Sequence, residues 1–259
     1  MSGILRCVSG PRELSDGERW LWLQWLAEGT NGDGLCGFDR TGWDSSIWIL
    51  HSIFEDPSPN YEATHDDLHR QRVAAGLEPP FEKILTDAGA VVVGNAVGMS
   101  EPRGVECERI RWSQLAERME IDFRQKTVPP CFRWFPYTSW PAGLWPPDEG
   151  SLDPESLHTL VEWLTDRSPA GDATECVGYF TPLIGANFDR PLMYQFRLSE
   201  IQELATAATI DTTPSNWWPL DKSWFIYTDW DLWATKISAT SSLLASLSTV
   251  TDLEQITWP

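Results

Sequence analysis

Apolar and polar positions along the chain alternate with two periods, one helical and one typical of strands. Ser15 and Glu18 have the spacing of a capping box, and the apolar run that follows ends at Gly29. This pattern predicts a substantially buried helix, because apolar residues occupy most of its circumference. Helical spacing also predicts helices over residues 44–54, 64–75, 112–119, 153–164, 199–205 and 243–247.

Shorter apolar runs and alternating patterns predict strands at 90–93, 105–110, 175–181, 193–198, 224–227, 232–237 and 253–258. The runs at 224–227 and 232–237 flank a polar turn around Asp229, which indicates a hairpin. Strands and helices alternate without a sustained β-α-β rhythm. We therefore expect an α+β fold with mainly antiparallel sheets and packed helices.

Prolines and aromatic side chains crowd the segment between Thr127 and Pro147. Such a segment cannot form a regular helix, and it is too apolar for a free linker. We expect an ordered connector over 127–150 that packs across the body of the protein. On either side of it, residues 1–126 and 151–259 are expected to form an N-terminal and a C-terminal α+β half of similar size.

The net charge of the chain excludes some classes of binding partner. The chain has 259 residues, and its 38 acidic and 19 basic side chains give a net charge of −19. An apolar content of 42% is that of a globular protein. The negative charge excludes broad binding to nucleic acid phosphates and disfavours docking on anionic lipid.

Sequence signals of compartment point to the cytoplasm. The first residues carry no apolar run of signal-peptide length, and no stretch has the ~18 apolar residues needed to span a bilayer. The five cysteines are widely spaced and lack any Cys-x-x-Cys pair. We expect reduced thiols in a cytoplasmic protein, with neither a disulfide framework nor a zinc site.

Sixteen tryptophans are the most unusual feature of the composition. Most of them sit beside other apolar residues, which favours an aromatic core. Tryptophans that stack on sugars or anchor a protein partner are the alternatives.

Asp229 and Asp231 follow an apolar strand pattern and resemble the Asp-x-Asp that holds a divalent metal and a nucleotide sugar in many glycosyltransferases. Those enzymes have a nucleotide-binding β-α-β half before the motif and much of the acceptor site after it. Here 259 − 231 = 28 residues follow, and no Gly-rich turn precedes the motif. A hairpin turn with exposed aspartates beside a core tryptophan is the simpler interpretation.

His65 and His69 have a spacing suited to zinc on one helix face. Residue 66 is Asp where the catalytic zinc motif has Glu, and the sequence offers no evident third ligand, so a solvated helix face is favoured. The chain also lacks a Walker loop, a nucleophile elbow and the dinucleotide-binding spacing. We accordingly expect no catalytic residue, no metal and no cofactor.

The segment from Trp217 to Lys236, together with residues 257–259, resembles the C-terminal part of uncharacterised cytoplasmic bacterial proteins. Some proteins of that kind are similar to immunity proteins of polymorphic toxin systems. The resemblance covers the last third of the chain. It implies an inhibitor without catalytic residues.

These observations favour a non-catalytic binding protein of immunity type, which neutralises a basic toxin through an acidic, Trp-containing face. Residues 1–150 carry 23 − 14 = 9 excess acids and residues 151–259 carry 15 − 5 = 10, so the shorter half is the more acidic per residue. We place the contact surface there, at Asp229, Trp230, Asp231 and Trp233. The alternative is an enzyme on sugars or nucleotide sugars that uses Asp229 and Asp231 as metal ligands or acid/base groups.

Overall fold

The structure is a computed structural model that describes residues 10–30, 34, 36–57, 62–79, 106–137, 139–185, 191–207 and 210–258. The predicted strand at 90–93 lies outside these residues. The helices are α1 (Asp16–Ala27), α2 (His65–Ala74), α4 (Trp112–Arg118), α5 (Pro154–Thr165), α6 (Pro182–Gly185), α7 (Ile201–Ala205) and α8 (Ser241–Leu247). Short 3-10 turns lie at Phe123–Gln125, Phe132–Trp134, Gly171–Ala173 and Leu198–Glu200.

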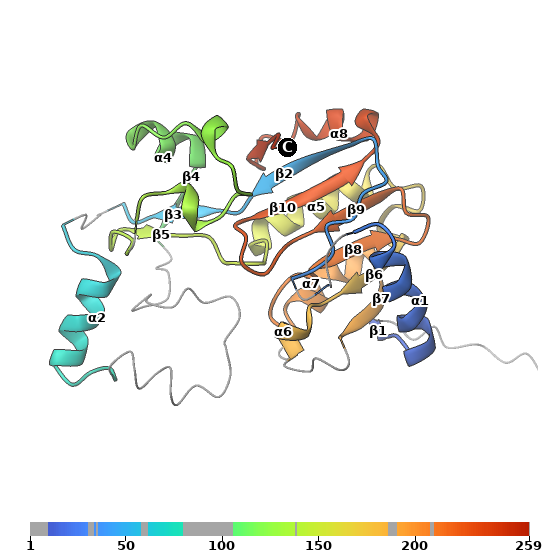
Figure 1. The fold of residues 1–259 in the computed structure, drawn as a ribbon, viewed down its shortest axis with the longest axis horizontal. Helices are drawn as coiled ribbons and strands as arrows, with labels where there is room; N and C mark the ends of the chain where they lie inside the picture. The colour runs from blue at the N-terminus through green and yellow to red at the C-terminus, as the bar shows by residue number, and fades with distance from the viewer. Residues whose placement is uncertain are drawn as a thin grey trace, which may run out of the picture.

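Two antiparallel sheets organise the described residues, which confirms the predicted α+β class (Figure 1). The large sheet has the order β1-β7-β6-β8-β9-β10-β2-β11, and the small sheet has the order β4-β3-β5. The strands are β1 (Arg12–Glu13), β2 (Ser45–Leu50), β3 (Ile53–Glu55), β4 (Glu108–Ile110), β5 (Leu144–Trp145), β6 (Glu175–Tyr179), β7 (Met193–Arg197), β8 (Asn216–Pro219), β9 (Trp224–Tyr227), β10 (Ala234–Ala239) and β11 (Gln255–Ile256).

Both faces of the large sheet are buried, so consecutive strand residues enter two different cores. In β8, Trp217 belongs to one core and Trp218 to the other. Side chains that follow one another along a strand point to opposite faces, so this alternation follows from the pleat. The tryptophan content therefore serves mainly to fill two aromatic cores, as the sequence indicated.

Each core has its own cover. Helix α1, helix α4 and the aromatic segment 131–144 close the first core, whereas α5, α7 and α8 close the second. Figure 1 shows α1 on the near side of the sheet and α5 behind it. Ser15 and Glu18 form the predicted capping box of α1. Asp153 caps α5, and its carboxylate accepts a hydrogen bond from the Ser156 amide at 2.9 Å.

The predicted helix over 44–54 is wrong, because this segment forms β2 and β3. Trp48 packs in the first core and Ile49 in the second, so β2 is apolar on both faces. A strand buried on both sides loses its polar–apolar alternation, and its spacing then also fits a helix. The strand expected over 105–110 is present in its last part, as β4.

The predicted division into two halves is not reflected in the sheet. Strand β2, from the first half, lies between β10 and β11, which both belong to the second half. Strand β1 likewise pairs with β7. The two predicted halves therefore share one large sheet and both of its cores, while the aromatic residues of the connector pack into the first core.

Candidate functional site

The predicted contact residues lie in the loop that joins β9 to β10. The loop is held at its base, where the Thr228 and Thr235 hydroxyls are 2.8 Å apart and the Leu232 amide donates to the Asp229 carbonyl at 3.1 Å. The Trp233 amide donates to the Pro130 carbonyl at 3.0 Å, which ties the loop to the connector. The hairpin is thus a packed turn with a defined position for its two aspartates.

Asp229 and Asp231 form a close carboxylate pair. The Tyr227 hydroxyl donates to Asp229 Oδ2 at 3.0 Å, and the Asp231 amide lies 3.4 Å from Asp229 Oδ1. Burial in the loop, a hydrogen bond with the Asp231 carboxyl and its negative charge together raise the pKa of Asp229 to about 7. Near neutral pH the Asp229 carboxyl is therefore still partly protonated.

A third carboxylate joins this pair from the connector. Burial raises the pKa of Glu149, the charge of Asp231 adds to this rise, and the nearby Trp233 indole opposes it. In the part of the chain that the structure describes, no Lys or Arg forms an ion pair with Glu149, Asp229 or Asp231. We call these three residues the acidic cluster; no ion pair among the described residues balances its charges.

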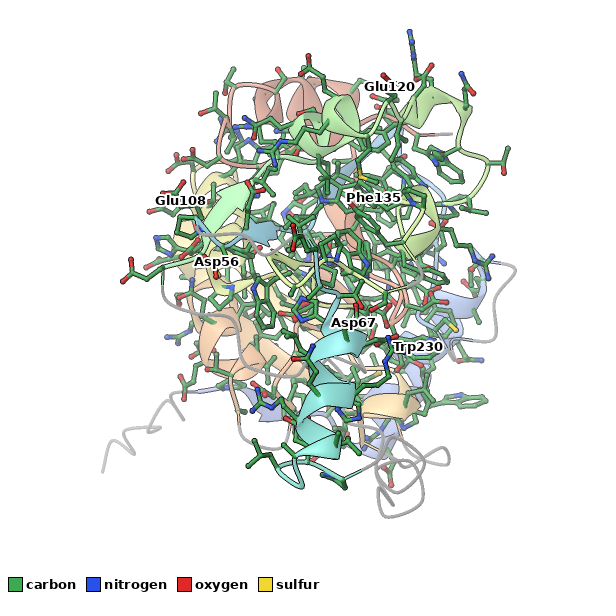
Figure 2. The ribbon with its side chains drawn as sticks, turned by 90° about the vertical axis from the view of Figure 1, so that its left-hand side faces the viewer. Asp56, Asp67, Glu108, Glu120, Phe135 and Trp230 are labelled. Atoms are coloured by element: carbon green, nitrogen blue, oxygen red, sulfur yellow. The ribbon has the colours of Figure 1, made fainter. Side chains whose placement is uncertain are left out.

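Trp230 lies between Asp229 and Asp231 in the sequence and is half-buried; Figure 2 marks its position in the fold. Its indole Nε1 donates to the Cys36 sulfur at 3.2 Å. Its backbone rests on Gly150, which has a φ of +70°, and a Cβ there would lie 2.6 Å from the Trp230 Cα. Glycine at 150 therefore allows the connector to pass directly under this loop.

Trp233, which the sequence analysis placed in the contact surface, is buried in the structure. It is only 3% exposed, and its ring lies 5.5 Å from Trp140 and 6.2 Å from Trp112 between ring centroids. Position 233 precedes β10, and its side chain closes the first core. The other three predicted residues remain at least partly accessible, with Asp231 exposed.

The histidine pair is buried, so the predicted solvated helix face is wrong. His65 Nε2 donates to the Leu144 carbonyl at 2.8 Å, and its ring meets Trp145 edge to face. His69 Nδ1 pairs with Glu78 at 2.9 Å. Helix α2 packs against β5, and the sequence of the helix alone does not show this contact. No cluster of three or more metal-ligating side chains occurs among the described residues.

The sequence analysis missed an exposed apolar pair on α1. Trp20 is 63% exposed and Leu21 66% exposed, whereas every other tryptophan is buried or half-buried. A substantially buried α1 was expected, and that expectation is wrong. The run Trp20-Leu21-Trp22-Leu23 contains the signal, because four consecutive helical residues point in four directions and cannot all face one core.

Helices of the described residues are too short or too polar to cross a membrane. Comparisons with protein-family models, with curated proteins and with solved structures gave no match.

Proposed function

We propose that this chain is a non-catalytic, cytoplasmic binding protein of immunity type, which captures a basic protein partner such as a toxin. The observation that carries the proposal is the acidic cluster. Glu149, Asp229 and Asp231 are brought together from two segments, and no described Lys or Arg forms an ion pair with them. Structural carboxylates are normally paired or well solvated, so a half-buried and unbalanced group is a candidate functional site.

A cation from a partner would satisfy this cluster. A Lys or Arg side chain placed against the pair stabilises the charged carboxylates and displaces the proton that Asp229 retains. The net charge of −19 attracts a basic partner over a longer range and raises the association rate. Trp230 supplies apolar contact area beside the charges, as tryptophan does at many interface hot spots.

Affinity capture from the source cell tests the proposal. The baits are the wild-type chain, the double variant Asp229→Asn/Asp231→Asn, and a control variant, Glu117→Gln/Asp172→Asn, which removes two exposed carboxylates elsewhere. We expect a basic protein that wild type and control retain at low salt and release at high salt, and that the double variant does not retain. Equal capture by all three baits would place the contact elsewhere.

Calorimetry with the captured protein then tests the role of the proton on Asp229. Binding should release protons to the buffer near neutral pH, so the measured enthalpy should depend on the ionisation enthalpy of the buffer. The Asp229→Asn variant should lose this dependence. An enthalpy that is the same in all buffers contradicts the proposed displacement of the proton by a cationic side chain.

The enzyme on sugars or nucleotide sugars is the second candidate, and the raised pKa of Asp229 beside Asp231 favours it, because such pairs divide acid and base roles. Calorimetry with manganese or magnesium separates the two candidates. Metal binding that disappears in Asp229→Asn supports the enzyme, and absence of metal binding supports the binding protein.

A further inference from the structure

A pocket of about 490 Å³ lies on the helical side of the connector, between the start of α5, the end of α7 and the segment around Asp211. Its size is within the usual range of roughly 300–1,000 Å³ for ligand pockets. Leu152, Leu157 and Ala205 give its floor an apolar surface, and the buried Thr212 and Thr213 share that floor. The pocket is therefore a built cavity with a lining that belongs to the second core.

Its rim is negative. Asp148, Glu203 and Asp211 line the pocket and are exposed, and the described residues that line it include no Lys, Arg or His. Neither Glu203 nor Asp211 forms an ion pair with a basic side chain in the described ranges. An apolar floor below carboxylates suits a ligand with an alkyl stem and a cationic head.

One short segment of the connector contributes to both the pocket and the acidic cluster. Asp148 and Ser151 line the pocket, Glu149 belongs to the cluster, and Gly150 lies against the Trp230 backbone. The residues 148–151 therefore link the pocket to the β9–β10 loop along the chain.

We infer that this pocket receives an alkylguanidinium or alkylammonium group, presented as an Arg or Lys side chain of the partner. The inference rests on the proposed function, and it adds a specific anchor to it. The stem of the side chain packs on the apolar floor while its head meets Glu203 and Asp211. A free polyamine offers the same chemistry from a different source.

NMR titration of the full chain tests the pocket with three probes: acetyl-Gly-Arg-Gly-amide, the same peptide with uncharged citrulline in place of arginine, and spermidine. The arginine peptide should shift the backbone amide signals of Gln202, Thr206 and Thr213, and the citrulline peptide should bind about tenfold more weakly because it lacks the charge. Tighter binding of spermidine than of the arginine peptide identifies a free polyamine as the ligand and overturns the assignment to a partner side chain.

Two double variants test whether the arginine peptide binds at the pocket. Glu203→Gln/Asp211→Asn keeps the shapes of both side chains and should weaken arginine-peptide binding about tenfold, whereas Glu117→Gln/Asp172→Asn removes the same charge and should leave it unchanged. Equal binding of the citrulline peptide, or equal loss in both variants, overturns the inference.

The same variants separate this inference from the proposed function. One outcome of the capture experiment is that the Asp229→Asn/Asp231→Asn bait loses the partner while the Glu203→Gln/Asp211→Asn bait retains it fully. That result overturns the inference about the pocket and supports the proposed function. The opposite result is specific binding of the arginine peptide in the NMR titration, with no captured partner whose retention depends on Asp229 and Asp231. That result contradicts the proposed function of the β9–β10 loop.

Discussion

Asp229 binds its proton more tightly than an ordinary aspartate does, and this couples the stability of the fold to pH. The unfolded chain loses the proton near pH 4, whereas the folded chain keeps it up to about pH 7. Between these values the native state binds more protons than the unfolded state, so stability falls as pH rises from about 4 to 7.

Asp229→Asn should remove this fall in stability with rising pH, because asparagine is neutral. Its side-chain oxygen can still accept the hydrogen bond from the Tyr227 hydroxyl. At pH 8 we expect the variant to be more stable by about 1 kcal/mol after solvent screening, or about 2–4 °C in Tm. The difference should narrow as pH is lowered towards 4. Thermal melting by circular dichroism at several pH values measures it, and a constant difference across the range would contradict the assignment.

Two tryptophans show how strongly the cost of a substitution depends on position. Trp112 is buried against Trp134, Phe135 and Trp233, and its indole donates to the His51 carbonyl at 2.7 Å. Trp112→Ala should cost about 3–5 kcal/mol in urea unfolding. Trp20→Ser should change stability by no more than about 0.5 kcal/mol, because the ring is mostly in water. Similar losses for the two variants would show that the Trp20 ring is packed.

At the scale of elements, helix α4 begins on a carboxylate from the far end of the chain. Glu254 accepts hydrogen bonds from the Trp112 amide at 2.7 Å and the Ser113 amide at 2.9 Å. The Glu254 carbonyl also accepts the Leu50 amide at 2.9 Å, so one residue joins the helix to β2. A charged acceptor at a helix N-terminus balances both the free amides and the helix dipole.

Glu254→Ala should therefore destabilise the fold by about 1–2 kcal/mol and raise amide exchange in α4 first. Glu254→Gln should destabilise the fold by less than Glu254→Ala does, because glutamine keeps one acceptor oxygen although it lacks the charge. Glu117→Ala, an exposed position on the same helix, serves as the control. Equal exchange rates in Glu254→Ala and Glu117→Ala would mean that the cap does not hold α4.

The sequence predicts elements well where a local signal is sufficient. Ser15 and Asp153 mark two helix starts, and the Asp229 turn marks the hairpin of β9 and β10. Predictions from local sequence are wrong where the burial of a residue depends on elements that are distant in the sequence. Residues 47–50 are apolar and pack into the cores on both faces of the sheet, and His65 is buried because β5 packs on α2. The aspartates of the candidate site could be found from sequence, but Glu149 could not, since only the fold brings it to them.

At the scale of the whole molecule, the large sheet depends on chain segments on both sides of the connector. Strand β2 pairs with β10 over six residues, from Ser45 to Leu50, and with β11 on its other edge. A fragment of residues 151–259 lacks this strand, so it exposes the edge of β10 and leaves Ile237 and Leu253 without the contribution of β2 to the second core. Exposed apolar strand edges favour aggregation over folding.

We therefore expect that residues 151–259 alone show no cooperative unfolding and no near-ultraviolet tryptophan signal, whereas the full chain unfolds in one transition. Co-expression with residues 1–150 should restore the signal, because the missing strand then returns in trans. The matched comparison is the fragment 45–259, which keeps β2 and lacks β1 and α1. If residues 151–259 unfold cooperatively by themselves, the C-terminal half is an independent domain and β2 only extends its sheet.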